Sequence, residues 1–215
     1  MRPDGALAAP PPFSIEDLRA RAATRLLPAP PDPDDPETVP IGEFALLAPD
    51  HTPRAAAVLI GVTPRAEPQL LLTQRAAHLP VHAGQISFPG GKREPGDPSP
   101  LATALREAQE EIGLDPAFAR PLGYLDLYVT NSGFAIVGCV AEVDPAYTLA
   151  LSPDEVDDAF EVPLGFLMAA ENHRVEMREW RGGLRKVHHM PWRDRHIWGV
   201  TAGLLHNLYE RLYAE

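Results

Sequence analysis

The sequence predicts a mixed α/β fold in which helices pack on a sheet, and two observations carry this prediction. Short apolar runs typical of buried strands lie both before and after a sharply bounded helix, and further helical pattern follows towards the C-terminus. Strands, a helix, more strands and then helices are the order expected of a layered α/β domain. The chain has 215 residues and is 45% hydrophobic, which is enough for one complete core.

Four apolar runs are the strand candidates. Residues 55–62 (AAAVLIGV) and 69–73 (QLLLT) precede the helix, with a polar turn between them, and residues 122–128 and 134–143 follow it. Cys139, the only cysteine, lies in the last run, and we expect it in the core. A single cysteine excludes a disulfide framework and a cysteine-based zinc site, and it suits a reducing compartment.

The central helix has clear signals at both ends, which predict that it spans residues 100–112. Ser99 can cap its N-terminus, Pro100 suits the first helical position, and Gly113 suits the position after its last turn. One stripe of small and apolar side chains should face the core: Leu101, Leu105, Ala108 and Ile112.

Three carboxylates lie on another face of this helix. With about 100° per residue, Glu107, Glu110 and Glu111 fall within one arc of about 100°. Like charges at these spacings repel, and a hard divalent cation bound by oxygen ligands would reverse that cost. On its own, such a motif is more often a solvated acidic face, so the flanking residues have to decide between the two interpretations.

The flanking residues resemble the Nudix box, G-x5-E-x7-R-E-U-x-E-E-x-G-U, where U is aliphatic. Residues 106–114 (REAQEEIGL) fit, and a Phe-Pro-Gly-Gly loop precedes the helix. The expected early glutamate position holds Pro98, with Asp97 one residue earlier. We infer that the loop is longer by one residue and that Asp97 or Glu94 takes the role of that glutamate, which in the family braces the loop through the box arginine, here Arg106.

The resemblance implies a Nudix fold, an α/β/α sandwich with a mixed β-sheet, and a metal-dependent hydrolase. Glu107 and Glu111 would be the main ligands of Mg²⁺ or Mn²⁺, with Glu110 as a further ligand or as the catalytic base, and Arg106 would hold the loop. Such metals polarise pyrophosphate oxygens and activate a bound water.

A second stretch, residues 71–91 (LLTQRAAHLPVHAGQISFPGG), narrows the resemblance. It is similar to the signature LLT-x-R-[SA]-x3-[RL]-x3-G-x3-FPGG of coenzyme A pyrophosphatases, with Pro80 where Arg or Leu is usual. The resemblance implies hydrolysis of coenzyme A or acyl-CoA to 3′,5′-ADP and 4′-phosphopantetheine. The candidates for substrate binding are Arg75, Gly90, Gly91 and Lys92. His78, His82 and Arg93 add cations near the loop, as a polyphosphate requires.

Some of these residues also have a purely structural interpretation. Gly90 and Gly91 could belong to an ordinary turn, Arg75 could pair with a carboxylate at the edge of the core, and the histidines could be surface residues. Ser152 and Glu155 match a capping box, which predicts a helix from about residue 153. Nudix enzymes often recruit a late glutamate as a general base or metal ligand, so Glu155 is also a catalytic candidate, with Asp154 and Asp157 nearby.

The ends of the chain differ in character. Residues 1–40 hold 10 of the 25 prolines and are expected to form an arm with one short helix near residues 14–27. Residues 41–215 are expected to be the Nudix domain. Residues 151–167 resemble that subfamily's acidic turn and helix, and residues 197–213 its C-terminal helix, in which Leu204, Leu205, Leu208 and Leu212 should face the core.

Charge and composition restrict the partners. A net charge of −11 argues against non-specific binding to nucleic acids or membranes, while an anionic small molecule stays open if a metal neutralises it. The chain has no apolar run of membrane-spanning length and no signal-peptide pattern, so we expect a cytoplasmic protein. A homodimer is left open.

Two other functions are compatible with the sequence. The first is Nudix hydrolysis of another nucleoside diphosphate derivative such as ADP-ribose or NADH, which would be favoured if the 71–91 signature were missing. The second is a catalytically inactive ligand sensor with the Nudix fold. Such a sensor usually lacks one of the paired glutamates, and this sequence retains all three.

Overall fold

A mixed sheet forms the centre of the molecule in a computed structural model that describes residues 9–35, 37–42, 52–180 and 183–214. Among these residues, the large sheet has the strand order β1-β7-β8-β2-β3-β4, with β5 also pairing with β2, β6 with β8 and β9 with β3. Strand β2 runs parallel to β8, and the pairings of β3 with β2, β4 and β9 are antiparallel. The strands of the large sheet are β1 (Ile41–Gly42), β2 (Arg54–Thr63), β3 (Gln69–Arg75), β4 (Ile86–Ser87), β5 (Gly90–Lys92), β6 (Ala119–Tyr124), β7 (Tyr128–Val129), β8 (Phe134–Val143) and β9 (Val156–Pro163).

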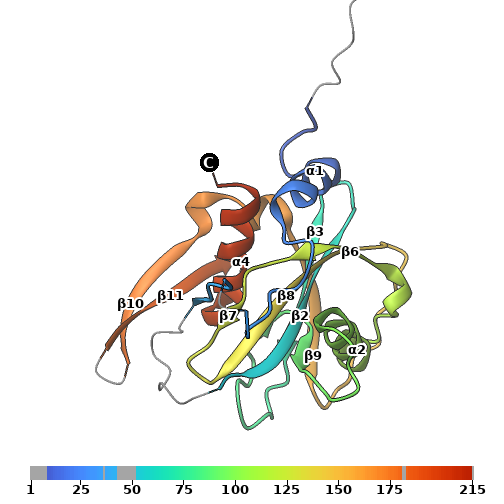
Figure 1. Cartoon of the computed structure of the whole chain (residues 1–215). Coiled ribbons are helices and arrows are strands. Elements are labelled where there is room, and N and C mark those ends of the chain that lie inside the picture. Colours follow the sequence, from blue (N-terminus) through green and yellow to red (C-terminus); the bar gives the residue numbers. More distant parts are fainter. Residues whose placement is uncertain (1–8, 36, 43–51, 181–182, 215) are drawn as a thin grey trace, which may run out of the picture.

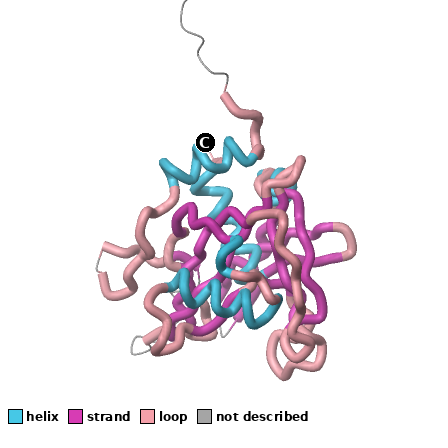
Figure 2. Tube along the Cα trace, turned by 90° about the vertical axis from the view of Figure 1, so that its right-hand side faces the viewer, coloured by secondary structure: helices cyan, strands magenta, loops and turns pink. Residues whose placement is uncertain are grey.

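Helices cover both faces of this sheet. Helix α2 (Pro100–Ile112) lies on one side of β2 and β8, and α4 (Gly199–Leu212) lies on the other (Figure 1). Figure 2 views the molecule from the side of α2, which lies in front of the strands. Alternate residues of β3 enter the two cores: Leu70 and Leu72 pack towards α4, and Leu71 packs towards α2. This arrangement is the α/β/α sandwich that the sequence analysis predicted.

The smaller elements complete the layers. Helix α1 (Ile15–Arg25) packs beside α4, and α3 (Leu164–Leu167) follows β9 directly. Short 3₁₀ helices lie at Pro116–Phe118 and Ala170–Asn172. A second, three-stranded antiparallel sheet contains β10 (Arg174–Trp180), β11 (Gly183–Trp192) and β12 (Arg195–Trp198). The sequence analysis did not anticipate this second sheet.

Most of the predicted elements are present, with shifted ends. Strands β2, β3 and β8 contain the predicted runs, and α2 spans the predicted residues 100–112. The run 122–128 is not one strand: β6 ends at Tyr124 and β7 begins at Tyr128. The C-terminal helix begins at Gly199 rather than at residue 197, because Ile197 and Trp198 pair with β11, and all four of its predicted core leucines are buried.

The prediction of a helix from about residue 153 is wrong. Residues 153–155 form a turn, and the chain enters strand β9 at Val156. Strand β9 pairs with β3 along almost its whole length, and its first residue Val156 and its penultimate residue Val162 are buried. The S-x-x-E pattern reflects only a local preference for starting a helix. Here the long-range pairing with β3 outweighs that preference, and the segment forms a strand.

The N-terminal helix is attached to the rest of the molecule. Ser14 caps α1 through a hydrogen bond from the Asp17 amide (3.2 Å), and Leu18 and Ala22 are buried in the core on the α4 side. Arg21 donates to the carbonyl of Leu212 at the end of α4 (2.8 Å). The described arm therefore packs on the body, and a domain boundary at residue 41 stays a prediction.

Cys139 lies in β8 between β2 and β6 and is 1% exposed. Burial raises the pKa of its thiol to about 12. The expected core position is thus observed. Among the described residues, no helix is both long enough and apolar enough to cross a membrane.

Candidate active site

Helix α2 presents its glutamates at three different depths. The helix begins where Ser99 Oγ accepts a hydrogen bond from the Ala102 amide (3.1 Å), and it ends at Gly113 in a left-handed conformation. Because Ala104, Ala108 and Ile112 fix the buried face, the glutamates lie beside it. Glu111 is only 4% exposed, whereas 17% of the Glu107 side chain and 54% of the Glu110 side chain are exposed.

The glycines of β5 lie directly against two of these carboxylates. The Gly90 amide donates to Glu111 Oε2 (3.1 Å), and a Cβ added at Gly91 would lie 2.5 Å from the carboxylate carbon of Glu107. Gly90 has φ +153, and its Cβ would lie 2.4 Å from the Ala57 carbonyl oxygen. The two glycines therefore let the strand pack closely under the glutamates, so they are not part of an ordinary turn. Their contact with a phosphate stays a prediction.

Asp97 and Arg106 brace the loop between β5 and α2. Arg106 Nε and Nη2 donate to Asp97 Oδ1 (3.1 Å) and Oδ2 (3.2 Å), and Asp97 Oδ2 also accepts from the Glu94 amide and the Thr103 hydroxyl (2.9 Å each). These hydrogen bonds, above all those from Arg106, hold the pKa of the Asp97 carboxyl well below its usual range. Of the two acids considered from the sequence, Asp97 contacts Arg106 and Glu94 contributes its backbone.

Arg106 also contacts two of the glutamates. It donates to Glu107 Oε1 (3.0 Å) and to Glu110 Oε2 (2.8 Å), while its Nη2 donates to the Lys92 carbonyl (3.0 Å). Within the described parts of the chain, no three His, Cys, Asp or Glu side chains already converge as a metal site. Since Glu107 Oε1 already accepts from Arg106, a metal bound by Glu107 would share this carboxylate with the arginine.

The charged form of Glu111 is the one that a bound cation would stabilise most. Burial raises its pKa to about 7; the hydrogen bond from Gly90 opposes the shift, and the negative charges of Glu107 and Glu155 add to it. Burial also raises the pKa of Glu107. No salt bridge to Glu111 is found among the described residues. Oxygen ligands that are partly buried and mutually repelling suit Mg²⁺ or Mn²⁺, so these residues fit such an ion.

Arg75 approaches the glutamates from the end of β3. A β-bulge at Gln74/Arg75 interrupts the pairing with β9, and the Arg75 amide donates to the Gln85 carbonyl (2.9 Å). The positive charge of Arg75 lowers the pKa of Glu111. Arg75 Nε is buried without a hydrogen-bond partner, and Arg75 forms no salt bridge with any residue in the described ranges. It is therefore not the core-edge ion pair that was considered as an alternative.

Glu155 approaches from the turn before β9. The Ser152 amide donates to the carbonyl of Glu111 (2.8 Å), and the Glu155 carbonyl accepts from the Ala76 amide (2.9 Å). This turn thus joins the end of α2 to the end of β3. The Glu155 side chain is exposed, and its charge contributes to the raised pKa values of Glu107 and Glu111. The structure brings Arg75, Glu107, Glu111 and Glu155 together from three elements.

The other predicted cations have different surroundings. Arg93 donates to the Asp97 carbonyl (Nη2, 3.3 Å), so it supports the loop. His82 Nδ1 lies 2.8 Å from Gln85 Oε1 on the surface. Lys92 is exposed, and its contact with the site runs through its backbone carbonyl. Arg75, by contrast, lowers the pKa of Glu111 through its positive charge.

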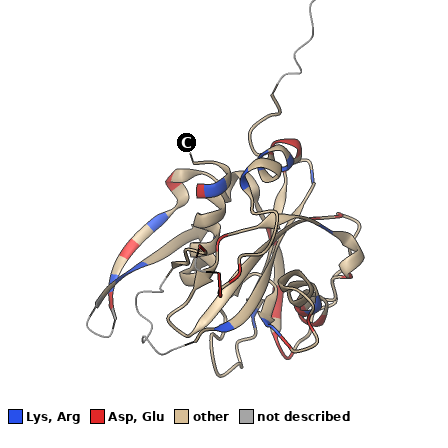
Figure 3. Ribbon diagram, viewed as in Figure 1, with Lys and Arg blue, Asp and Glu red and all other residues tan. Residues whose placement is uncertain are grey.

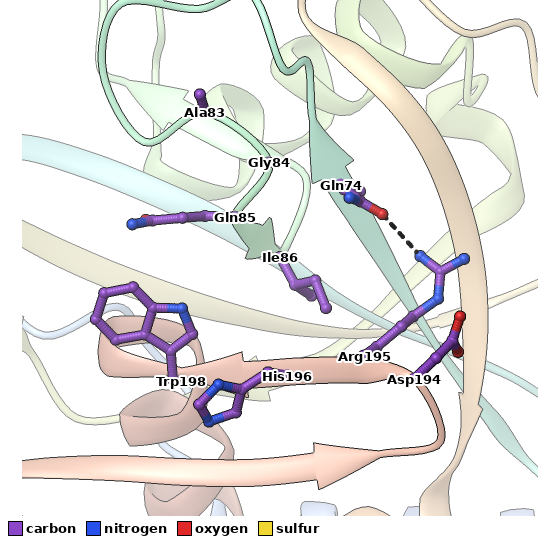
Figure 4. Close-up of a pocket in the computed structure, with 9 residues that line it drawn as sticks. All are labelled: Gln74, Ala83, Gly84, Gln85, Ile86, Asp194, Arg195, His196 and Trp198. Carbon is purple, nitrogen blue, oxygen red and sulfur yellow. Dashed lines mark hydrogen bonds between the residues drawn. The ribbon is translucent and has the colours of Figure 1, made fainter.

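A pocket of about 500 Å³ is lined in part by the loop that follows Arg75 (Figure 4). Arg195 donates to Gln74 Oε1 (3.1 Å) and to Asp158 Oδ2 (2.6 Å), so its charge is compensated. The pocket thus combines a compensated arginine with amide, imidazole and indole side chains. The lining residues are Gln74, Ala83, Gly84, Gln85, Ile86, Asp194, Arg195, His196 and Trp198.

Asp157 was named from the sequence as an acid near Glu155, but the long-range contacts that Asp157 and Arg195 make in this region were missed. Asp157 Oδ2 accepts from the Ala77 amide (2.8 Å), which ties the loop after β3 to β9. Arg195 reaches Gln74, which is 121 positions away in the chain. Only the acidic run DEVDD hinted at Asp157, and no local signal marks Arg195, because its partners become neighbours only after the second sheet has formed.

Known proteins resemble this chain in sequence and in fold. The NUDIX domain model matches residues 52–181. The "Uncharacterized Nudix hydrolase NudL" of Salmonella typhimurium is 39% identical over 175 residues, which cover 78% of this chain and 90% of that protein. Among solved structures, a NUDIX hydrolase from Alicyclobacillus acidocaldarius shares 20% identity at a TM-score of 0.44, covering 55% of this chain and 82% of that chain. The NUDIX domain of Shewanella oneidensis NrtR, solved with ADP ribose, shares 20% identity at a TM-score of 0.42, covering 57% of this chain and 81% of that chain.

The protein thus has an α/β/α sandwich in which an acidic helix packs on a glycine strand. The family match covers most of the chain and includes this helix, so the protein belongs to the Nudix hydrolase family. Members of the family are pyrophosphatases that act on phosphorus-containing anhydrides in small molecules, and they generally use divalent metal ions.

Proposed function

We propose that this protein hydrolyses the pyrophosphate of coenzyme A or acyl-CoA to 3′,5′-ADP and (acyl-)4′-phosphopantetheine. The observation that carries the proposal is the position of Arg75, the arginine of the 71–91 signature. Its charge acts on Glu111, and its buried Nε has no partner in the described residues. An arginine held in this state next to the carboxylates is suited to a phosphate group of the substrate.

In this proposal Glu107 and Glu111 are the main ligands of Mg²⁺ or Mn²⁺, and Glu110 is a further ligand. The bound ion would polarise the pyrophosphate and lower the pKa of a coordinated water. Support comes from the burial of Glu111 and from the close packing of Gly90 and Gly91 against the two ligands.

The protein's own residues have distinct roles. Arg106 holds the loop through Asp97 and keeps the carboxylates of Glu107 and Glu110 in place. Glu155 or Glu110 accepts the proton from the attacking water. Glu155 is favoured, because Glu110 already forms a salt bridge with Arg106, whereas no described residue forms a salt bridge with Glu155.

The substrate contacts follow from the same geometry. Arg75 binds a phosphate, the backbone at Gly90 and Gly91 approaches the pyrophosphate, and Lys92 adds positive charge from the exposed end of β5. We also propose that the protein works in the cytoplasm, which agrees with its single, buried cysteine.

One assay tests the proposal. Coenzyme A, several acyl-CoAs, ADP-ribose, NADH and nucleoside triphosphates should be incubated with the enzyme and either Mg²⁺ or Mn²⁺, with products identified by mass spectrometry. We expect coenzyme A or an acyl-CoA to have the highest kcat/KM and to release 3′,5′-ADP. If ADP-ribose or NADH is the better substrate, the enzyme is a Nudix pyrophosphohydrolase of another specificity. If nothing in the panel is cleaved while ligands still bind, the inactive-sensor alternative is favoured.

A further inference from the structure

The second sheet has a long edge that is unpaired among the described residues. Strand β10 is the outermost strand of the order β10-β11-β12 and pairs with β11 over seven positions. The side chains of residues 174–179 are all exposed, with Val175 at 50% and Met177 at 51%. An edge of this kind is a template for pairing with another chain unless its side chains oppose it.

Positive and negative side chains alternate on one face of β10, so this face can pair with a second copy of itself. Arg174, Glu176 and Arg178 point to one face, and the charges along the strand alternate in sign (Figure 3). Val175, Met177 and Glu179 point to the other face. We propose that two copies of this chain form a homodimer by antiparallel pairing of β10 with β10, with the two-fold axis at Met177.

Charge and the length of the strand together select this register. A two-fold axis perpendicular to the sheet keeps the faces continuous, so only residues of the same face can stand opposite each other. With the axis at Met177, Glu176 stands opposite Arg178 of the second copy, and symmetry makes this pair twice. With the axis at Glu176 or at Arg178, that residue would stand opposite its own copy. An axis at Val175 would also place opposite charges across it, Arg174 against Glu176, but Val175 lies near one end of β10. Met177 is the middle residue of the strand, so an axis there lets all seven positions pair. Opposite charges stabilise a cross-strand pair, and like charges destabilise it.

The single chain already presents these charges at the edge. Arg178 Nη2 lies 3.0 Å from Glu176 Oε2, and His189 Nε2 lies 3.2 Å from the same oxygen. Because Glu176 and Arg178 are exposed, pairing exchanges a same-strand contact for a cross-strand contact and leaves no charge buried without a partner. At the axis, the two Met177 side chains meet and remove apolar surface from water.

Charge reversal on the full-length protein tests the dimer. Sedimentation velocity over a concentration series would give the dimer dissociation constant for the wild type, Glu176→Arg, Arg178→Glu and the double variant. Each single reversal places two like-charged pairs across the axis, so we expect the dissociation constant to rise at least about tenfold. The double variant restores opposite charges in the same register and should return to within about threefold of the wild type. Glu67→Arg, on an exposed turn after β2, is the matched charge control and should not change the dissociation constant.

Three results of this experiment would contradict the proposed dimer. A wild type that stays monomeric at about 100 μM overturns the proposal. So does a dimer that tolerates either single reversal, or one that the double variant fails to restore. Circular dichroism melts of all variants check that the hairpin is folded, because a reversal that acted only on the contact between Glu176 and Arg178 within one chain would alter the melting temperature without altering the mass.

Discussion

Glu111 combines deep burial with a negative charge. Its carboxylate is 4% exposed, accepts a hydrogen bond from Gly90, and has a pKa raised to about 7 by burial. Keeping a carboxylate charged in a buried position costs free energy. A bound cation would offset this cost, because its positive charge compensates the buried negative charge. Neighbouring residues thus differ in role: Glu110, one position earlier, is more than half exposed and contacts Arg106.

Glu111→Gln tests the metal assignment. The amide keeps an oxygen that can accept from Gly90 but lacks the charge that binds a cation. We expect kcat to fall at least ~10²-fold, equivalent to about 2.7 kcal/mol of transition-state stabilisation. Without metal, the melting temperature should stay the same or rise, because a buried charge has been removed. Steady-state kinetics at saturating Mg²⁺ and a thermal melt in EDTA measure both quantities. Turnover close to the wild type would rule out Glu111 as a ligand.

Glu155 offers a choice between catalysis and structure. The helix that it was expected to cap does not exist, and its hydrogen bonds to the described residues all run through its backbone, so the substitution Glu155→Gln leaves them in place. We therefore expect unchanged stability together with a lower kcat and an altered acid limb of the pH–rate profile. Asp154→Asn, on the same exposed turn, is the control. An unaltered pH profile would leave Glu110 as the candidate base.

Arg75 should report on the phosphates of the substrate. Coenzyme A carries a 3′-phosphate that dephospho-CoA lacks, and a charge-assisted contact with it is worth roughly 1.5–3 kcal/mol. We expect coenzyme A to exceed dephospho-CoA by about 10- to 100-fold in kcat/KM, and Arg75→Ala to remove most of this difference. Equal kcat/KM values for the two substrates in the wild type would show that the 3′-phosphate is not recognised. A uniform loss on both substrates would assign Arg75 to the pyrophosphate instead.

At the scale of elements, the packing of β5 on α2 sets the geometry of the glutamates. The helix could be predicted from the sequence because its cap, its first proline and its final glycine all act locally. The contact between Gly91 and Glu107 could not, since it depends on how far β5 lies from the helix axis. The bracing acid was narrowed to two residues from the loop length, and the structure was needed to distinguish Asp97 from Glu94.

Gly91→Ala tests this contact. The new methyl group would lie 2.5 Å from the carboxylate of Glu107, which is the flexible end of its side chain and can move away. We expect a fold that is little destabilised but a kcat that falls markedly, because one ligand has been displaced from its position. Gly96→Ala is the matched control, since its Cβ would meet nothing within 4 Å. The test compares kcat and the melting temperature of the two variants with those of the wild type. If Gly91→Ala has the same kcat as Gly96→Ala, the position of Glu107 is not critical for catalysis.

At the scale of the whole molecule, the N-terminal helix completes a core that the family match does not include. The match begins at residue 52, yet Leu18 and Ala22 of α1 are buried against the α4 side. The sequence predicted this helix from Ser14 and the pattern after it, but it gave no reason to expect docking. Short amphipathic helices are stabilised by what they pack against, and that partner, α4, lies almost 200 residues further along the chain.

Leu18→Ala tests the docking of α1. The side chain is 0% exposed, and its truncation should cost about 2–5 kcal/mol of unfolding free energy, measured by urea denaturation. Glu16→Ala, on the exposed side of the same helix, should change the unfolding free energy by less than about 0.5 kcal/mol. Similar small losses for both variants would mean that the arm is an independent appendage, as a boundary at residue 41 implies.

The buried thiol in the middle of the large sheet has a practical consequence. Cys139 is the only cysteine in the chain, it is 1% exposed, and burial raises its pKa to about 12. Alkylating reagents attack the thiolate, so the folded protein is effectively free of reactive sulfur. Alkylation of Cys139 then requires the strands around β8 to separate. The rate of alkylation therefore measures how often the sheet opens. A fluorophore on a newly introduced surface cysteine would, for the same reason, attach at one position without replacing the native residue.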